Sequence, residues 1–98
     1  MDKAAESANT VFRVARVADD EEVQRSMDLI GACVAWVKDP TRLRVQEVAT
    51  GTDTVIREVP REECCRSLRT WLPTNKHFLS GDERADMEQL VREACGGG

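Results

Sequence analysis

The feature that most constrains the fold is a turn between two strand-like segments, the second of which ends at a proline. Residues 42–49 (RLRVQEVA) place Leu43 and Val45 opposite polar side chains, as in a half-buried strand, and Val48 then interrupts the alternation, which indicates a bulge. Gly51, in the sequence TGTD, supplies the glycine typical of a tight turn. TVIREV then runs to Pro60, a residue that donates no hydrogen bond to a sheet. The pattern predicts an antiparallel hairpin.

Helical periodicity dominates much of the remaining sequence. Asp19 and Asp20 are residue types that cap helices, and a set of apolar residues recurs after them at spacings of four and three. These residues are Val23, Met27, Ile30, Val34 and Val37. We therefore expect one long helix through residue 37, ended by Pro40. A second helix is expected from residue 61 until Pro73, and a third over residues 81–95, where Ser80 and Glu83 match a capping box.

The segment 10–17 (TVFRVARV) fits two structures. Its β-branched residues favour a strand, whereas the spacing of its apolar residues equally suits a helical face, and we expect a strand. The predicted fold class is α+β: a small antiparallel sheet, formed by the hairpin and this N-terminal strand, packed by one long helix and two C-terminal helices. Residues 1–9 are expected to be a disordered tail, 10–95 a single domain and 96–98 a flexible glycine tail.

Charge and hydropathy narrow the classes of partner. The formal charge of −4 disfavours binding to phosphate backbones, so nucleic acid is not the expected partner. Arg42, Arg44 and Arg57 lie on the predicted strands, and a nucleic-acid-binding module that uses this arginine-bearing face is an alternative. No apolar run reaches the roughly 18 residues of a membrane span, and residues 1–10 do not resemble a secretion signal. We expect a cytoplasmic protein.

Four cysteines and one histidine bear on metal binding and catalysis. Without a CxxC pair, and with His77 alone in a predicted loop, neither a metal site nor a catalytic triad is expected, so the sequence predicts no cofactor and no enzyme. Cys64 and Cys65 point about 100° apart on a helix and do not face each other. We expect packed, reduced thiols, with a redox-responsive regulator centred on this pair as the alternative.

The apolar stripe of the long helix suggests a function. Trp36, together with a second apolar side of that helix, predicts a contact surface for a protein partner or a second copy, and the alternative is that the stripe is simply core. The sequence thus predicts a non-catalytic adaptor or regulatory interaction module. Its predicted partner-binding residues are Val23, Met27, Ile30, Val34 and Trp36, with Arg44 and Arg57 as polar anchors.

The segment 50–60 (TGTDTVIREVP) resembles the closing strand of the FlaG-like flagellar accessory proteins. The similarity lies in a Thr-Gly turn followed by Val55–Ile56–Arg57, an acidic residue, an aliphatic residue and Pro60, with helices on both sides. The cysteines and the helix over residues 81–95 are not part of that pattern. The resemblance implies a non-enzymatic accessory protein of the flagellar filament.

Overall fold

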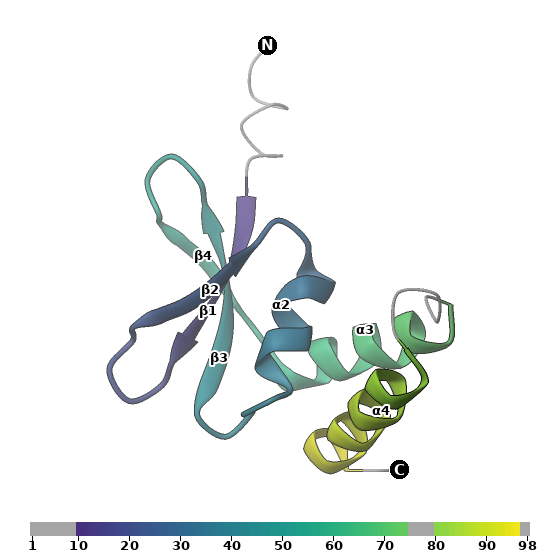
Figure 1. The fold of residues 1–98 in the computed structure, drawn as a ribbon. Coiled ribbons are helices and arrows are strands. Elements are labelled where there is room, and N and C mark those ends of the chain that lie inside the picture. The colour runs from purple at the N-terminus through teal and green to yellow at the C-terminus, as the bar shows by residue number, and fades with distance from the viewer. Residues whose placement is uncertain (1–9, 75–79, 97–98) are drawn as a thin grey trace.

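The computed structural model describes residues 10–74 and 80–96, in the order β-β-α-β-β-α-α. The strands are β1 (Thr10–Arg16), β2 (Glu22–Ser26), β3 (Leu43–Ala49) and β4 (Val55–Val59). The helices are α2 (Leu29–Trp36), α3 (Arg61–Thr74) and α4 (Gly81–Cys95). The strands form one antiparallel sheet in the order β2-β1-β3-β4 (Figure 1). The α+β class with a small antiparallel sheet is confirmed, as is the strand near the N-terminus.

The predicted hairpin is formed by β3 and β4. Its register shifts between Glu47 and Val48, where the interrupted alternation predicted a bulge. The left-handed residue of the turn is Asp53, with φ of 56°, rather than Gly51. Aspartate tolerates this conformation better than most residues, so the turn does not depend on the glycine in the way the sequence suggested.

The prediction of one long helix after residue 19 is wrong. The chain instead makes a second hairpin from β1 into β2, and only the eight residues of α2 are helical. Asp20 has φ of 61°, and the side chain of Asp19 accepts a hydrogen bond from the backbone N–H of Glu21 at 3.1 Å. The two aspartates therefore shape a turn rather than cap a helix, because a side chain that bonds its own loop backbone stabilises turns as well as helix starts.

A glycine allows α2 to begin close to the end of β2. A Cβ atom at Gly31 would lie 2.3 Å from the Oγ atom of Ser26, a separation that no side chain tolerates without movement. Val37, directly after α2, is buried like Trp36. The stripe predicted for a long helix thus combines an exposed strand with a short buried helix.

Only α2 packs directly against the strands; α3 packs against α2 and α4 against α3, so the helices extend away from the sheet in chain order (Figure 1). Both ends of α4 are as predicted: Ser80 and Glu83 form the capping box, and Gly96 adopts the left-handed conformation after the last turn. Pro73 does not stop α3, which continues to Thr74. The Thr74 hydroxyl lies 3.1 Å from the carbonyl oxygens of Thr70 and Trp71, to which it donates, and so closes the last turn.

One hydrophobic core joins the sheet to all three helices. Its strand residues are Val14, Val45 and Val59, which lie side by side in the sheet register. Leu68, fully buried in α3, is among its largest side chains. The expectations for residues 1–9, for the loop that holds His77 and for the last two glycines fall outside the described residues.

Candidate functional site

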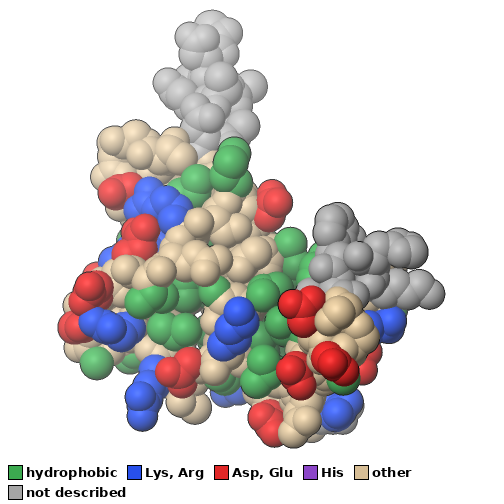
Figure 2. Space-filling model, viewed as in Figure 1, with side chains coloured by type: hydrophobic (Ala, Val, Ile, Leu, Met, Phe, Trp, Pro, Cys, Tyr) green, Lys and Arg blue, Asp and Glu red, His purple; other side chains and the backbone are tan. Residues whose placement is uncertain are grey.

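Arginines and carboxylates alternate on the sheet face that points away from the helices. This face is set by the strand period of two, because neighbouring residues of Val14 and Val45 point to the opposite side. Its arginines are Arg13, Arg25 and Arg44, and its carboxylates are Asp20, Glu22 and Asp53. Positive and negative side chains are likewise interspersed over the strands in the view of Figure 2.

Asp20 is the centre of this network. Its carboxylate lies 2.6 Å from the Arg44 guanidinium and 3.2 Å from that of Arg13. Hydrogen bonds from Arg44 first, and then from Arg13, hold the pKa of Asp20 below its ordinary value of 3.8. Arg25 bridges Glu22 at 2.8 Å and Asp53 at 3.0 Å, and so links β2 to the turn between β3 and β4. Each arginine of this face already has a carboxylate partner, which opposes its use as a phosphate-binding surface.

We expect acid to weaken this network and Asp20→Asn to remove part of the effect. Because the pKa of Asp20 is lowered by folding, its stabilisation is present above the ordinary value and is lost as pH falls through the lower, folded value. Asparagine keeps the left-handed backbone of position 20 and removes only the charge. Urea unfolding should show the variant less stable than the parent near pH 7, and the difference should be smaller at a pH below 3.8. An equal difference at both pH values would contradict this role.

The two predicted polar anchors lie on opposite faces of the sheet. Arg44 belongs to the outer face, whereas Arg57 lies on the helix side, 2.8 Å from Glu47 and 2.9 Å from Glu63 of α3. Arg57 therefore fastens β4 to the start of α3. The structure does not bring the two arginines together into one contact surface.

The apolar contact residues predicted for one helix stripe are also separated. Val23, on β2, is 48% exposed, and Met27, just after β2, is 83% exposed. Trp36 is only 4% exposed and belongs to the core, against which Ile30 and Val34 also pack. The prediction of Trp36 as a contact residue is therefore wrong. Exposed Val55 and Ile56, adjacent on the opposite edge strand β4, were not predicted as contact residues.

The cysteines form two disulfides, and the prediction of reduced thiols is wrong. Cys33 of α2 is bonded to Cys64, and Cys65 is bonded to Cys95 of α4. The separate directions of Cys64 and Cys65, which exclude a bond between them, let each reach a different neighbouring helix. The signals in the sequence were the even number of cysteines and the adjacent pair on a predicted helix, whose side chains diverge.

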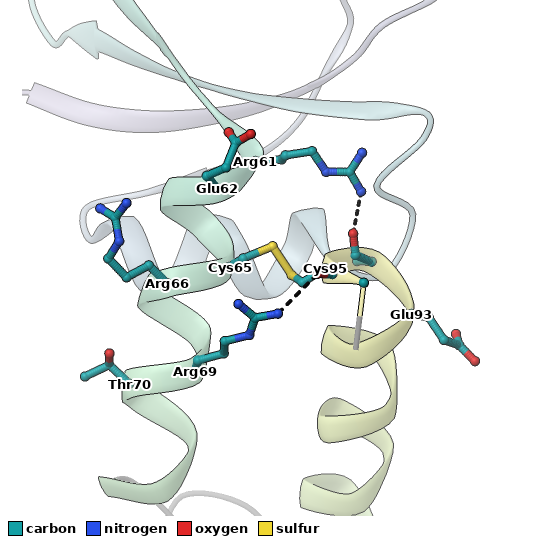
Figure 3. A pocket seen from close by; sticks show the side chains of 10 residues that line it. Arg61, Glu62, Cys65, Arg66, Arg69, Thr70, Glu93 and Cys95 are labelled. Carbon is teal, nitrogen blue, oxygen red and sulfur yellow. Dashed lines mark hydrogen bonds between the residues drawn. A yellow bond between two sulfur atoms is a disulfide. The ribbon is translucent and has the colours of Figure 1, made fainter. Parts of the chain in front are cut away.

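A groove of about 730 Å³ lies where α4 ends against α3, and the Cys65–Cys95 disulfide forms part of its wall. Arg61 and Arg69 of α3 donate hydrogen bonds to the last carbonyls of α4, those of Ala94 and Cys95 (Figure 3). These arginines satisfy carbonyl groups that have no partner within their own helix, at its negative end. Arg66 also lines the groove.

Membrane insertion and metal binding, two further classes of site, concern residues 10–74 and 80–96. No helix there has the length and hydropathy needed to cross a membrane. The same residues contain no group of three or more metal-ligating side chains. Comparison of the chain with family models, with curated proteins and with solved structures gives no match, so the site rests on its own geometry.

Proposed function

We propose that this chain is a non-catalytic interaction module that forms a homodimer by pairing β2 with β2 of a second copy. The observation that carries the proposal is the position of β2 at the edge of the sheet, with Val23 and Met27 exposed beside it. Among the described strands, only β1 pairs with β2, so its outer edge presents backbone donors and acceptors. Such edges bind further strands by main-chain hydrogen bonds.

The charged residues of β2 do not protect its outer edge from pairing with another strand. Natural edge strands often carry charged side chains that prevent pairing with another chain. The charged residues of β2 are Glu22 and Arg25, and both are held in the ion-pair network of the outer sheet face with Arg13 and Asp53. The edge is therefore left with an apolar side chain, Val23, and the neutral Gln24.

The strand register favours β2 over β4 as the place where two copies meet. Antiparallel self-pairing of β2 about Gln24 sets Val23 opposite Arg25 and Glu22 opposite Ser26 of the second copy, without a pair of like charges. The same pairing of β4, about its central residue, sets Arg57 opposite itself. Like charges directly opposite in a sheet are destabilising.

The test is the solution mass of the oxidised protein, measured by light scattering over a wide concentration range. We expect a monomer–dimer equilibrium that Val23→Lys weakens about tenfold, because the new lysine faces Arg25 of the second copy at two symmetric places. Ile56→Lys is the matched control, since it places the same change on the other edge strand, at a similarly exposed position. It should leave the equilibrium unchanged.

Two results would overturn the homodimer. A strict monomer at all concentrations would remove it, and the free edges would then point to a different protein as partner. A dimer that Ile56→Lys dissociates and Val23→Lys does not would move the interface to β4. Circular dichroism of both variants checks that each keeps its fold.

A FlaG-like accessory role is the second proposal. Its support is local: the segment 50–60 forms the turn and strand β4, and a helix follows directly, as the resemblance implies. Sedimentation of the purified protein with flagellar filaments would support it, and an absence of co-sedimentation at saturating filament would count against it.

The cytoplasmic location stays a proposal. The two disulfides oppose it, because disulfides persist mainly in oxidising compartments. Alkylation of the four cysteines in freshly lysed cells decides the matter, because fully alkylated protein indicates a reducing compartment and protected cysteines an oxidising one.

A further inference from the structure

We propose that the Cys65–Cys95 disulfide is a site of thiol–disulfide exchange that reacts preferentially with anionic thiols, while Cys33–Cys64 stays closed. The two bonds differ in access. Cys33 and Cys64 are 0% and 1% exposed, inside the core between α2 and α3. Cys95 is half-buried and lines the groove at the end of α4. A thiol in solution can therefore approach Cys95 but not the inner bond.

The arginines of α3 surround Cys65 in a regular way. Arg61 and Arg69 are placed four residues before and four residues after it, and residues at this spacing share one helix face. Figure 3 shows their guanidinium groups on either side of the disulfide, directed toward the end of α4. A thiolate that forms on Cys65 would lie between these two positive charges, which lower the pKa of a thiol.

Cys95 shares part of this positive charge, because Arg69 donates to its carbonyl oxygen. Cys95 is, however, the last residue of α4, where the helix dipole is negative and disfavours an anion. In disulfide exchange, the sulfur with the more stable thiolate is the better leaving group. Both access and electrostatics therefore direct the incoming thiol to Cys95 and make Cys65 the leaving group.

Exchange at the Cys65–Cys95 bond takes two steps. A thiolate RS⁻ attacks Sγ of Cys95, the Cys65–Cys95 bond breaks, and its electron pair leaves on Sγ of Cys65. The products are a mixed disulfide, Cys95–S–S–R, and the Cys65 thiolate. A second thiol then displaces the Cys95 thiolate from the mixed disulfide and forms RSSR, so the protein gains two electrons and the thiols lose them.

The groove selects the charge of the thiol. Arg61, Arg66 and Arg69 line it with only two carboxylates, and that of Glu93 is directed away from the disulfide in Figure 3. The Arg66 side chain donates no hydrogen bond within the described part of the chain, and its charge also acts on Glu63. Its guanidinium is directed away from the disulfide in Figure 3, so it adds positive charge at the rim of the groove. A groove of about 730 Å³ has the size of a small-molecule site and accommodates a thiol as large as a short peptide.

The experiment compares two probes on the oxidised full chain: 2-mercaptoethanesulfonate, which is anionic, and 2-mercaptoethanol, which is neutral. Aliquots are quenched with N-ethylmaleimide, and peptide mapping by mass spectrometry then identifies each modified cysteine. We expect the mixed disulfide on Cys95 and the maleimide on Cys65, with Cys33–Cys64 intact. The anionic thiol should react about tenfold faster at low salt, and this advantage should shrink as salt rises.

Arg66→Gln tests the charge selection. It should slow the sulfonate probe about threefold and 2-mercaptoethanol less, because the attacking thiolate carries two negative charges in the first and one in the second, and the substitution removes a positive charge without touching the disulfide. Arg42→Gln is the matched control, because Arg42 is also an exposed arginine and lies in the turn directly before β3, and it should change neither rate. Opening of Cys33–Cys64 at an equal or higher rate, a mixed disulfide on Cys65, or equal rates for both probes would each overturn the proposal.

Discussion

Replacing Cys33 and Cys64 together by alanine should lower the free energy of unfolding by about 4 kcal/mol. The bond closes a ring between residues 31 apart in sequence, and a ring of that size restricts the unfolded chain by about this amount. Alanine fills part of the space and leaves no buried polar atom behind. Urea unfolding without reductant, followed by tryptophan fluorescence, measures the change.

The second disulfide provides a matched control. Cys65 and Cys95 are 30 residues apart, so their replacement by alanine should lower the free energy of unfolding by a similar amount, because it frees the unfolded chain to a similar extent. A loss below about 1 kcal/mol for the Cys33–Cys64 variant would mean that this bond contributes little to the folded protein. A domain of this size has only about 5–15 kcal/mol in total, so either loss is large.

Trp36→Ala should be similarly damaging, at about 3–5 kcal/mol. Trp36 is almost fully buried in the core cluster, beside Cys33 and Val37 of the same turn region. Alanine at this site leaves a large cavity, which the surrounding helices and strands fill only in part. Chemical unfolding detected by far-ultraviolet circular dichroism is the measurement, since the substitution removes one of the two tryptophans.

Met27→Asp separates this core role from a surface role. Met27 was predicted on the same helix stripe as Trp36, but its side chain is mostly exposed. The charge should therefore cost less than about 0.5 kcal/mol in the monomer. If Met27→Asp unfolds the protein, or if Trp36→Ala leaves its stability unchanged, the assignment of these two residues to surface and core is wrong.

Local patterns predicted the elements whose ends are marked by special residues. The hairpin of β3 and β4 and the capping box of α4 could be read directly, because turn residues and caps act on their own backbone. The prediction of a helix after Asp19 was wrong for a related reason. Aspartates stabilise a turn and a helix start by the same side-chain bonds, and packing of β2 on β1 decides between them.

The disulfides and the exposed edge strand show the same limit of prediction from local sequence. The sequence placed Cys64 and Cys65 on one helix and showed that they diverge, but it could not show which helices lie on either side. Val23 was predicted to lie on a helical contact surface, and the structure places it, exposed, on a strand. Partners that are distant in the chain depend on tertiary packing, and a periodic pattern in one segment does not contain that information.

The adjacent cysteines have a mechanical consequence. The two disulfides close successive rings that meet at the single peptide bond between Cys64 and Cys65. When the ends of the chain are pulled apart, the force passes through the two disulfides and not through the backbone that they enclose. Each disulfide therefore prevents about 100 Å of backbone from extending. Opening Cys65–Cys95 alone would release one such length while Cys33–Cys64 still enclosed the other. The unfolded chain under tension would then have two defined maximum lengths, one for each state of the Cys65–Cys95 bond.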